Sequence, residues 1–189
     1  MTYVQRRRFL WILFIAGLLL LAVVAASGTT LSRLNLDDLA RESTAIARMR
    51  CVGSFSSWEK GEIWTVTKFE VMEIEKGDLP GIVSVRLLGG TVGHLRSRVD
   101  EVPTFRPGEE VYLFLWGETG KSFQVLGWSQ GTFRIRRDPQ SGIESVTQDS
   151  ASASIFDPHS RSFHRRGFRN LPVALFRARL QKALERDAE

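Results

Sequence analysis

The sequence is poor in the residues that most often carry metal or thiol chemistry. Its 189 residues include one cysteine, Cys51, and three histidines, His94, His159 and His164. A single cysteine cannot form an internal disulfide. Its place in an alternating apolar run predicts a small buried side chain rather than a reactive thiol. His159 and His164 do not form a recognisable ligand motif, so we expect no metal site and no cofactor.

No motif of a known catalytic class occurs in the setting that its chemistry needs. Residues 127–131 have the spacing Gly-x-Ser-x-Gly, but they lie between two expected strands, whereas a nucleophile elbow needs a strand followed by a helix. Glu109 and Glu110 are adjacent, but neighbours in an extended chain point to opposite sides, so the two carboxylates cannot share a proton. The glycines of residues 89–93 lack the lysine and following helix of a phosphate-binding loop. We therefore expect a protein that is not an enzyme, and an enzyme of unrecognised type is the third interpretation.

The positive charge is concentrated at the two ends of the chain. The net charge is +5, and residues 27–154 hold 15 Lys and Arg against 17 Asp and Glu. Residues 155–189 hold 8 basic residues against 4 acidic ones. Because the body is near neutral, the overall basic balance is a poor argument for nucleic acid binding. We expect no nucleic-acid partner.

An uncharged apolar segment, residues 9–26, follows three arginines at positions 6, 7 and 8. This is the order of the n-region and h-region of a signal peptide, and the residues before Ser27 suit cleavage after Ala26. As a helix the segment would span roughly 27 Å, which also approaches the thickness of the bilayer hydrocarbon. Two alternatives follow: a secreted or periplasmic protein, or a single-pass membrane protein anchored through residues 9–26. In both, the rest of the chain lies outside the cytoplasm.

Residues 31–147 predict a small β-rich domain. Asn35 is a suitable N-cap for a short helix that contains Leu36 and Leu39. Alternation from residue 45 to 55 and a β-branched run at residues 63–74 predict a hairpin. Parity changes along the second strand, which predicts a bulge near Thr67 and Lys68. Further strands are expected at residues 82–88, 111–116, 123–128, 131–136 and 143–147, with a long loop at residues 89–107.

The C-terminal part predicts two different segments. Residues 148–169 are rich in Ser, Asp, Arg and His, which is typical of a flexible basic linker. Residues 170–187 predict an amphipathic helix, because Val173, Phe176 and Leu180 recur on one face. We expect this helix to dock on the domain or on a partner.

Four short sequences carry a resemblance to a known group. They are Ile63-Trp64-Thr65, Glu73-Ile74-Glu75-Lys76-Gly77, Arg106-Pro107-Gly108-Glu109 and Gly127-Trp128-Ser129-Gln130-Gly131-Thr132-Phe133. The chain resembles a group of uncharacterised bacterial secreted proteins over roughly residues 31–146. The resemblance implies a closed five-stranded OB-like barrel, similar to tissue inhibitors of metalloproteinases and netrin-like modules, and no established activity.

The mechanism of those inhibitors does not carry over to this chain. They use a disulfide-bonded cysteine at the mature N-terminus, whereas cleavage after Ala26 would leave Ser27 there and Cys51 is unpaired. The expected fold class is mainly β: a small OB-like barrel with a short N-terminal helix and a C-terminal amphipathic helix, preceded by a signal or transmembrane helix.

The predicted contact surface is the barrel rim with the loop at residues 89–107. Its candidate residues are Trp64, Thr91, His94, Arg96, Arg98 and Trp128. A second candidate set, for an anionic lipid or acidic partner, comprises Arg161, Arg165, Arg166 and Arg169, for which a solvated basic tail is the alternative. Tryptophans with Tyr112 and Phe114 could also form an aromatic binding face, although a small barrel needs most of them in its core.

We therefore expect an exported or membrane-tethered, non-enzymatic β-barrel binding module of the bacterial cell envelope. Its ligand or envelope protein partner is not specified by any motif. The alternative is a protease-inhibitor-like or envelope assembly factor that acts on a protein partner.

Overall fold

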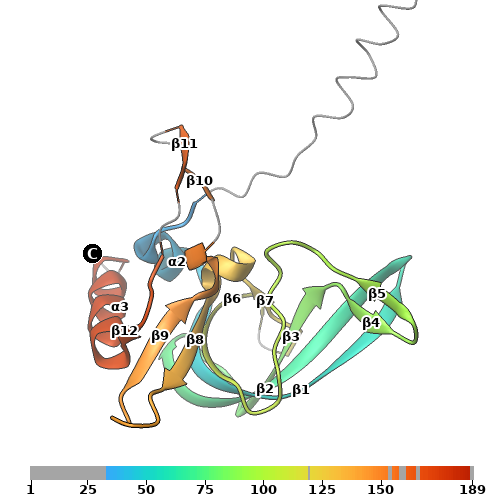
Figure 1. The fold of residues 1–189 in the computed structure, drawn as a ribbon, viewed down its shortest axis with the longest axis horizontal. Helices are drawn as coiled ribbons and strands as arrows, with labels where there is room; N and C mark the ends of the chain where they lie inside the picture. Colours follow the sequence, from blue (N-terminus) through green and yellow to red (C-terminus); the bar gives the residue numbers. More distant parts are fainter. Residues whose placement is uncertain (1–32, 119, 153–154, 158–160, 165–166, 188–189) are drawn as a thin grey trace, which may run out of the picture. The chain divides into compact units, whose positions relative to one another are not determined.

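The computed structural model describes residues 33–187, except residues 119, 153–154, 158–160 and 165–166 (Figure 1). Most strands in this part form one antiparallel sheet, and two helices lie together at one side of it. No described helix is long and apolar enough to cross a membrane. The predicted signal or transmembrane segment, residues 9–26, lies outside the described residues.

The described elements follow in chain order. They are α2 (Leu36–Glu42), β1 (Ala45–Glu59), β2 (Glu62–Lys76), β3 (Ile82–Leu88), β4 (Gly90–Val92), β5 (Leu95–Ser97), β6 (Glu110–Trp116), β7 (Gln124–Val125), the 3-10 helix η1 (Trp128–Gly131), β8 (Thr132–Arg137), β9 (Glu144–Gln148), the 3-10 helix η2 (Asp149–Ser152), β10 (Ile155–Asp157), β11 (Ser162–His164), β12 (Leu171–Pro172) and α3 (Val173–Asp187).

The large sheet has the strand order β12-β9-β8-β6-β1-β2-β3, with β7 also paired to β6. The β1–β2 hairpin has the register Ile46↔Lys76 at its open end and Glu59↔Glu62 at its turn. Two small hairpins, β4–β5 and β10–β11, lie outside this sheet. The mainly β class and the predicted first hairpin are thus confirmed, whereas the predicted loop at residues 89–107 contains the β4–β5 hairpin.

The sheet is not closed into the predicted barrel. Its ladder ends at β3, which meets the chain ahead of β7 through an isolated parallel bridge between Val85 and Phe123. There the Phe123 N–H donates to the Ser84 carbonyl and the Arg86 N–H donates to the Phe123 carbonyl, each at 2.8 Å. The expected strand at residues 123–128 is only the two-residue β7, because the chain turns away through Gly127 at φ 59°.

Helix α2 forms where the sequence predicts it. Asn35 is its N-cap and accepts a hydrogen bond from the Asp38 N–H at 2.9 Å, while the Asp38 carboxylate accepts one from the Asn35 N–H. This reciprocal capping box satisfies two amide donors that a short helix leaves free. The last helix, α3, begins at Val173, three residues after the predicted start at residue 170. The predicted linker at residues 148–169 contains η2, β10 and β11, and its flexibility stays a prediction.

Two hydrophobic cores lie on opposite faces of β6. Leu113 and its alternate neighbours face the inside of the curled sheet with Met49, whereas Tyr112 and Phe114 face the helices. Phe176 of α3 packs in the helix-side core, with its ring centroid 5.0 Å from that of Tyr112. Burial of each large apolar side chain contributes about 1.5–3 kcal/mol. Burial also raises the pKa of Tyr112 to about 12, so its hydroxyl stays neutral at physiological pH.

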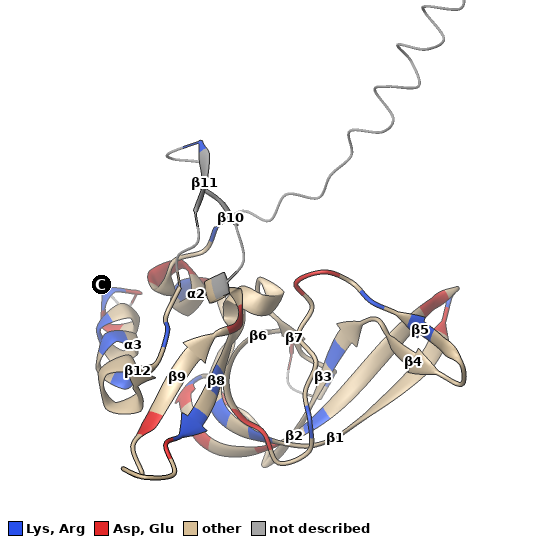
Figure 2. Ribbon diagram, viewed as in Figure 1, with Lys and Arg blue, Asp and Glu red and all other residues tan. Residues whose placement is uncertain are grey.

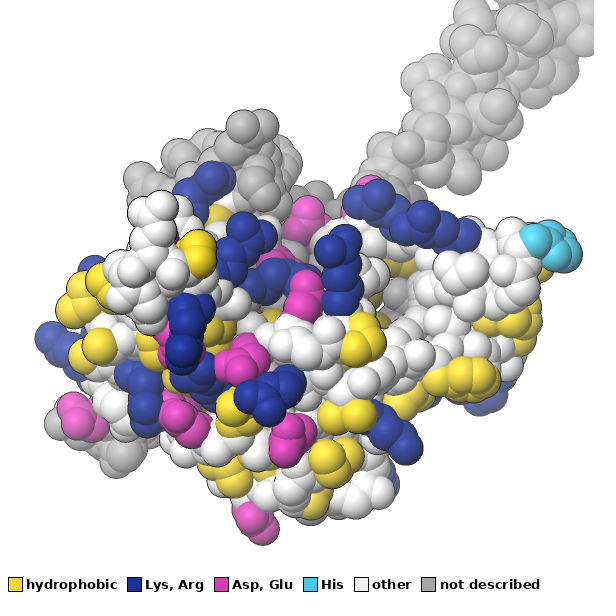
Figure 3. All heavy atoms as spheres, turned by 60° about the horizontal axis from the view of Figure 1, so that its bottom comes forward, with side chains coloured by type: hydrophobic (Ala, Val, Ile, Leu, Met, Phe, Trp, Pro, Cys, Tyr) yellow, Lys and Arg dark blue, Asp and Glu magenta, His cyan; other side chains and the backbone are white. Residues whose placement is uncertain are grey.

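Arg48 links three strands through partly buried ion pairs. From β1 it donates to Glu110 on β6 and to Glu144 on β9, with an Nη1–Oε2 distance of 3.0 Å to Glu144. The Arg48 side chain is only 12% exposed. These hydrogen bonds, aided by Arg50 and Arg137, hold the pKa of both carboxyl groups below the ordinary value of 4.5. Figure 3 shows basic and acidic side chains interleaved on one face of the molecule.

Replacement of Arg48 by methionine should destabilise the fold in a pH-dependent manner. The lowered carboxyl pKa values mean that these ion pairs stabilise the folded state fully above about pH 4.5 and less as the pH falls below it. We expect a loss of about 2 kcal/mol at pH 7. Thermal unfolding followed by circular dichroism from pH 7 to 3 should show that the difference in stability between the variant and the wild type becomes smaller below about pH 4.5. Lys68→Met, an exposed charge removal on β2, is the control, and a gap independent of pH would contradict the assignment.

Candidate functional site

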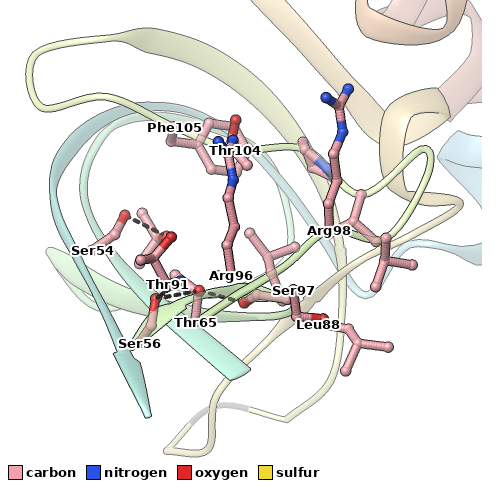
Figure 4. A pocket seen from close by; sticks show the side chains of 17 residues that line it. Ser54, Ser56, Thr65, Leu88, Thr91, Arg96, Ser97, Arg98, Thr104 and Phe105 are labelled. Atoms are coloured by element: carbon pink, nitrogen blue, oxygen red, sulfur yellow. Dashed lines mark hydrogen bonds between the residues drawn. The ribbon is translucent and has the colours of Figure 1, made fainter. Parts of the chain in front are cut away.

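A pocket of about 400 Å³ lies at the β3–β4 end of the curled sheet (Figure 4). Its walls come from β1, β2, the end of β3, the β4–β5 hairpin and the loop that follows it. The lining residues are Ser54, Ser56, Thr65, Thr67, Leu87, Leu88, Gly89, Gly90, Thr91, Arg96, Ser97, Arg98, Val99, Val102, Pro103, Thr104 and Phe105. We call it the hydroxyl pocket, after the serines and threonines on its β1–β2 wall. Small-ligand sites commonly have volumes of about 300–1,000 Å³.

The β1–β2 wall carries two cross-strand hydroxyl pairs. Ser54 Oγ lies 2.8 Å from Thr67 Oγ1, and Ser56 Oγ lies 2.8 Å from Thr65 Oγ1. Thr65 donates its one hydroxyl hydrogen to the Gly89 carbonyl at 2.6 Å. Ser56 must then donate to Thr65, because each hydroxyl has one hydrogen and two lone pairs. The Ser56–Thr65 pair can therefore offer a ligand only acceptor lone pairs.

A β-bulge at Val52 places these serines inside. On β1 Cys51 pairs with Phe69 and Gly53 pairs with Lys68, so one residue of β1 has no opposite residue on β2. The extra residue shifts the alternation by one. Before the bulge the odd-numbered residues Met49 and Cys51 face inward, and after it the even-numbered Ser54 and Ser56 do.

The bulge predicted near Thr67 and Lys68 was wrong in position, because the β1–β2 register shifts at Val52 on β1 and at Met72 and Glu75 on β2. Residues 63–71 of β2 keep strict alternation, with Thr65, Thr67 and Phe69 inward and Val66 and Lys68 outward. The parity change of apolar residues arises because some of them face solvent, as Ile74 does with 46% exposure. Exposed apolar side chains are common at protein surfaces. There is thus no bulge at Thr67 and Lys68, and the register shifts of β2 lie nearer to its C-terminal end.

Gly90 lets β4 lie directly against the hydroxyl wall. Its φ is 140°, and an added Cβ would lie 2.3 Å from Thr65 Oγ1 and 2.4 Å from Ser56 Oγ. The next residue, Thr91, donates its N–H to Ser56 Oγ at 3.4 Å. Only glycine fits both this backbone conformation and this close approach. The sequence pair Gly89-Gly90 thus sets the floor of the pocket as well as ending β3.

Arg96 and Arg98 supply the charge of the pocket. They are two residues apart along β5 and the residue beyond it, so both side chains leave the chain on the same side. Figure 4 shows Arg96 extending across the pocket toward Thr104 and Phe105, and Arg98 rising beside it. No hydrogen bond or ion pair to either side chain exists among the described residues. The lining contains no Asp or Glu.

The loop after β5 is held over the pocket by Arg134 of β8. Arg134 donates to the Thr104 carbonyl at 2.9 Å and to Glu109 at 2.8 Å, while its Nε pairs with Asp149 at 2.7 Å. Its guanidinium also lies 5.3 Å from the centre of the Phe105 ring. Because one side chain joins both ends of the loop segment at residues 104–109 to the sheet, this wall of the pocket has a defined position.

The start of the same loop is tied to η1. Glu101 accepts hydrogen bonds from Ser129, at its carboxylate from the Oγ and at its carbonyl from the N–H, the latter at 3.0 Å. Glu101 has a φ of 64°, a conformation that few non-glycine residues adopt. Contacts made by residues far apart in sequence thus define both ends of the loop.

The structure gathers half of the predicted contact residues. Thr91, Arg96 and Arg98 line the hydroxyl pocket. His94 is exposed in the β4–β5 turn, outside the lining. Trp64 lies outside it too and stacks against Arg86, whose guanidinium is 4.0 Å from the ring centroid.

Trp128 lies in η1, with a φ of 52°, and is not among the residues that line the hydroxyl pocket. Tyr112 and Phe114 are fully buried, in agreement with the prediction that they belong to the core. Trp116 is 47% exposed on β6. The aromatic side chains therefore do not share one binding face.

Half of the second predicted set lies outside the described residues. Arg161 is exposed, and Arg169 donates to the Ala151 carbonyl, which fixes it to η2. Arg165 and Arg166 lie outside the described residues, so a contact surface built by these arginines stays a prediction. Among the described residues, no group of three or more His, Cys, Asp or Glu is placed to hold a metal. Cys51 is buried, as predicted, and burial raises its pKa.

Sequence reasoning missed the hydroxyl wall. Ser54, Ser56, Thr65 and Thr67 are common surface residues, and their pairing depends on the register of two strands. The available signal was the occurrence of threonines at inward positions of β2, between the buried Ile63 and Phe69. A buried face that switches from apolar to hydroxyl side chains indicates a polar cavity.

Comparisons with known proteins give no match for this chain. No protein-family model, no curated protein and no solved structure matches it. The resemblance to a group of secreted proteins therefore stays a prediction.

Replacement of Arg134 by methionine should release the loop over the pocket. We expect backbone amides of residues 104–109 to exchange with deuterium roughly tenfold faster or more, because hydrogen bonds from the charged guanidinium are lost. Exchange of the β1–β2 hairpin should change little. Hydrogen exchange followed by mass spectrometry tests this, with Arg136→Met on the same strand as control. Equal protection of the loop in both variants would show that Arg134 does not hold it.

Proposed function

We propose that this chain is an exported or membrane-tethered binding module that holds a small polar ligand in the hydroxyl pocket. One observation carries the proposal: a cavity of about 400 Å³ combines paired hydroxyls with two arginines that have no partner among the described residues. Most of the arginines on the sheet are paired with carboxylates. Unused hydrogen-bonding groups that converge on a cavity are typical of ligand sites.

The composition of the walls supports a small molecule. Leu87, Val99 and Phe105 supply apolar surface, while Thr65 and Arg96 supply groups that orient polar atoms. An apolar wall with a few directed polar groups is the usual design of a small-molecule site. The loop wall is held by Arg134, so the pocket exists before a ligand binds. A preformed site avoids much of the entropy cost of ordering its walls on binding.

Export is supported by the sequence alone. The arginines at positions 6–8 and the apolar residues 9–26 predict either a cleaved signal peptide or an anchor. A binding module outside the cytoplasm would capture its ligand in the envelope. The proposal holds for both alternatives, since the pocket belongs to residues after the segment.

A bulky side chain at Thr91 should abolish ligand binding. Thr91 is exposed and lines the pocket, so Thr91→Trp would fill the cavity with little effect on the core. The wild-type full-length chain, in a neutral detergent, is dialysed against a panel of sugars, sugar acids, sugar phosphates, hydroxy acids and amino acids. We expect at least one compound to be retained by the wild type and lost in Thr91→Trp. Mass spectrometry of the retained compounds makes the measurement.

Leu95→Trp is the matched control. Leu95 is 47% exposed in the same hairpin and does not line the pocket, so this variant should keep the ligand. Retention of no compound by the wild type, or equal retention by Thr91→Trp, would reject the pocket as the binding site.

A protein partner is the second candidate, favoured by apolar side chains on the outside of the β1–β2 hairpin. Val52 is 55% exposed and Phe55 73%, and both line one groove with Val66. Contiguous exposed apolar surface marks many protein contacts. This interpretation corresponds to an inhibitor or assembly factor in the envelope.

If this second candidate is right, Phe55→Ser should abolish a stoichiometric complex that the full-length chain forms in native cells. The fold should be little affected, because the side chain is mostly exposed. Cross-linking followed by affinity purification measures the complex. Leu175→Ser, which removes an exposed apolar side chain from α3 instead, is the control. Recovery of the same complex with Phe55→Ser would rule out this surface.

A further inference from the structure

We infer that the ligand of the hydroxyl pocket is a hydroxylated anion of about the size of a monosaccharide, either a sugar acid or a sugar phosphate. This inference rests on the proposed function and adds the chemical class of the ligand. It depends on three features of the pocket: its unbalanced positive charge, the direction of its hydroxyl hydrogen bonds and the apolar loop wall.

The positive charge of the pocket is not balanced by the protein. Arg96 and Arg98 lie on the same side of one strand, and no carboxylate is among the lining residues. Elsewhere on the sheet Arg48 pairs with Glu110 and Arg86 with Glu59. In the ribbon of Figure 2, β5 and the chain that follows it carry the colour of basic residues. Two guanidinium groups that have no partner in the described part of the chain are suited to a carboxylate or phosphate, which they bind through paired N–H donors.

The Ser56–Thr65 pair on the opposite wall accepts hydrogen bonds from a ligand and has no hydroxyl hydrogen left to donate. Thr65 gives its hydrogen to the Gly89 carbonyl, and Ser56 therefore gives its own to Thr65. Each of these oxygens keeps a free lone pair, since an oxygen accepts two hydrogen bonds. Sulfate has no hydrogen to donate to these acceptors and hydrogen phosphate has only one, whereas the several hydroxyl groups of a sugar can donate to both oxygens. The pocket thus combines donors for an anionic group with acceptors for hydroxyl groups.

The third wall, formed by the loop after β5, provides an apolar surface for the carbon atoms of a ligand. Val99 and Val102 are partly buried, and Phe105 is 9% exposed with its ring held edge-on against Phe69, at a centroid distance of 5.0 Å. The C–H surface of a sugar ring is apolar enough to contact such residues. A volume of about 400 Å³ accommodates one sugar unit and its charged group, whether the unit is free or ends a longer glycan.

Calorimetric titration with matched probes tests the inference. The full-length chain in a neutral detergent is titrated with glucose, glucuronate, glucose 6-phosphate and inorganic phosphate. We expect one of the two charged sugars to bind roughly tenfold more tightly than glucose or more, as hydrogen bonds to a charged group predict. It should also bind more tightly than inorganic phosphate, and raised salt should weaken it.

Variants separate the two parts of the site. The double variant Arg96→Gln, Arg98→Gln should reduce the affinity for the charged sugar to that for glucose. Thr65→Val should weaken the sugar anions much more than inorganic phosphate, because several sugar hydroxyl groups donate to the acceptor oxygens and hydrogen phosphate has a single O–H. Arg106→Gln, an exposed charge removal in the same loop outside the lining, is the control and should bind as the wild type does. Circular dichroism checks that each variant is folded.

Three results would overturn the inference. If glucose bound as tightly as the charged sugars and Thr91→Trp abolished both, the pocket would be a ligand site without a preference for anions, and the proposed function would stand. If inorganic phosphate matched glucose 6-phosphate, the site would recognise the anion alone. If none of the four probes bound, the ligand would not be a sugar anion, and the dialysis panel would decide the proposed function independently.

Discussion

The pairing of β1 with β2 is the constraint on which the rest of the structure depends. These long strands curl the sheet and present residues to both of its faces. Within this pairing, the bulge at Val52 exchanges the side chains that face inward, so that Met49 and Cys51 fill the core while Ser54 and Ser56 line the pocket. One extra residue thus converts the same inner face from an apolar core to a polar cavity, because alternation has a period of two.

The polar pocket lies beside a rigid apolar framework. Strand β6 is buried on both faces, by the interior core on one side and by α2 and α3 on the other, so its position is strongly determined. Arg134 on the adjacent β8 extends from this framework to Thr104 and thereby positions the loop. Binding groups positioned by a rigid scaffold bind with a smaller loss of entropy than mobile ones. The loop forms one wall of the pocket. Its sequence has no periodic pattern, so its position depends on such contacts with the sheet.

Local signals predicted the elements that depend on nearby residues. The capping residue Asn35, the alternation through Ala45 and Met49, and the apolar face of α3 around Phe176 each reflect interactions within a few residues, and the structure confirms them. The prediction of a closed barrel was wrong. Closure requires the strands at the two edges of the sheet to pair, and among the described residues the edge strand β3 makes only the isolated bridge to Phe123 beyond its pairing with β2. The β4–β5 hairpin was missed since three-residue strands give almost no periodic signal.

The sequence by itself determined the mainly β class, the two helices and three of the residues that line the pocket, Thr91, Arg96 and Arg98. Composition, turn residues and alternation are local properties, so a single chain displays them. Only the tertiary structure decided that these residues line one pocket with Ser56 and Thr65, and that no carboxylate of the described residues pairs with the arginines. Those relations join residues up to about forty positions apart through strand register, and register is a property of the assembled sheet that no short segment of sequence contains.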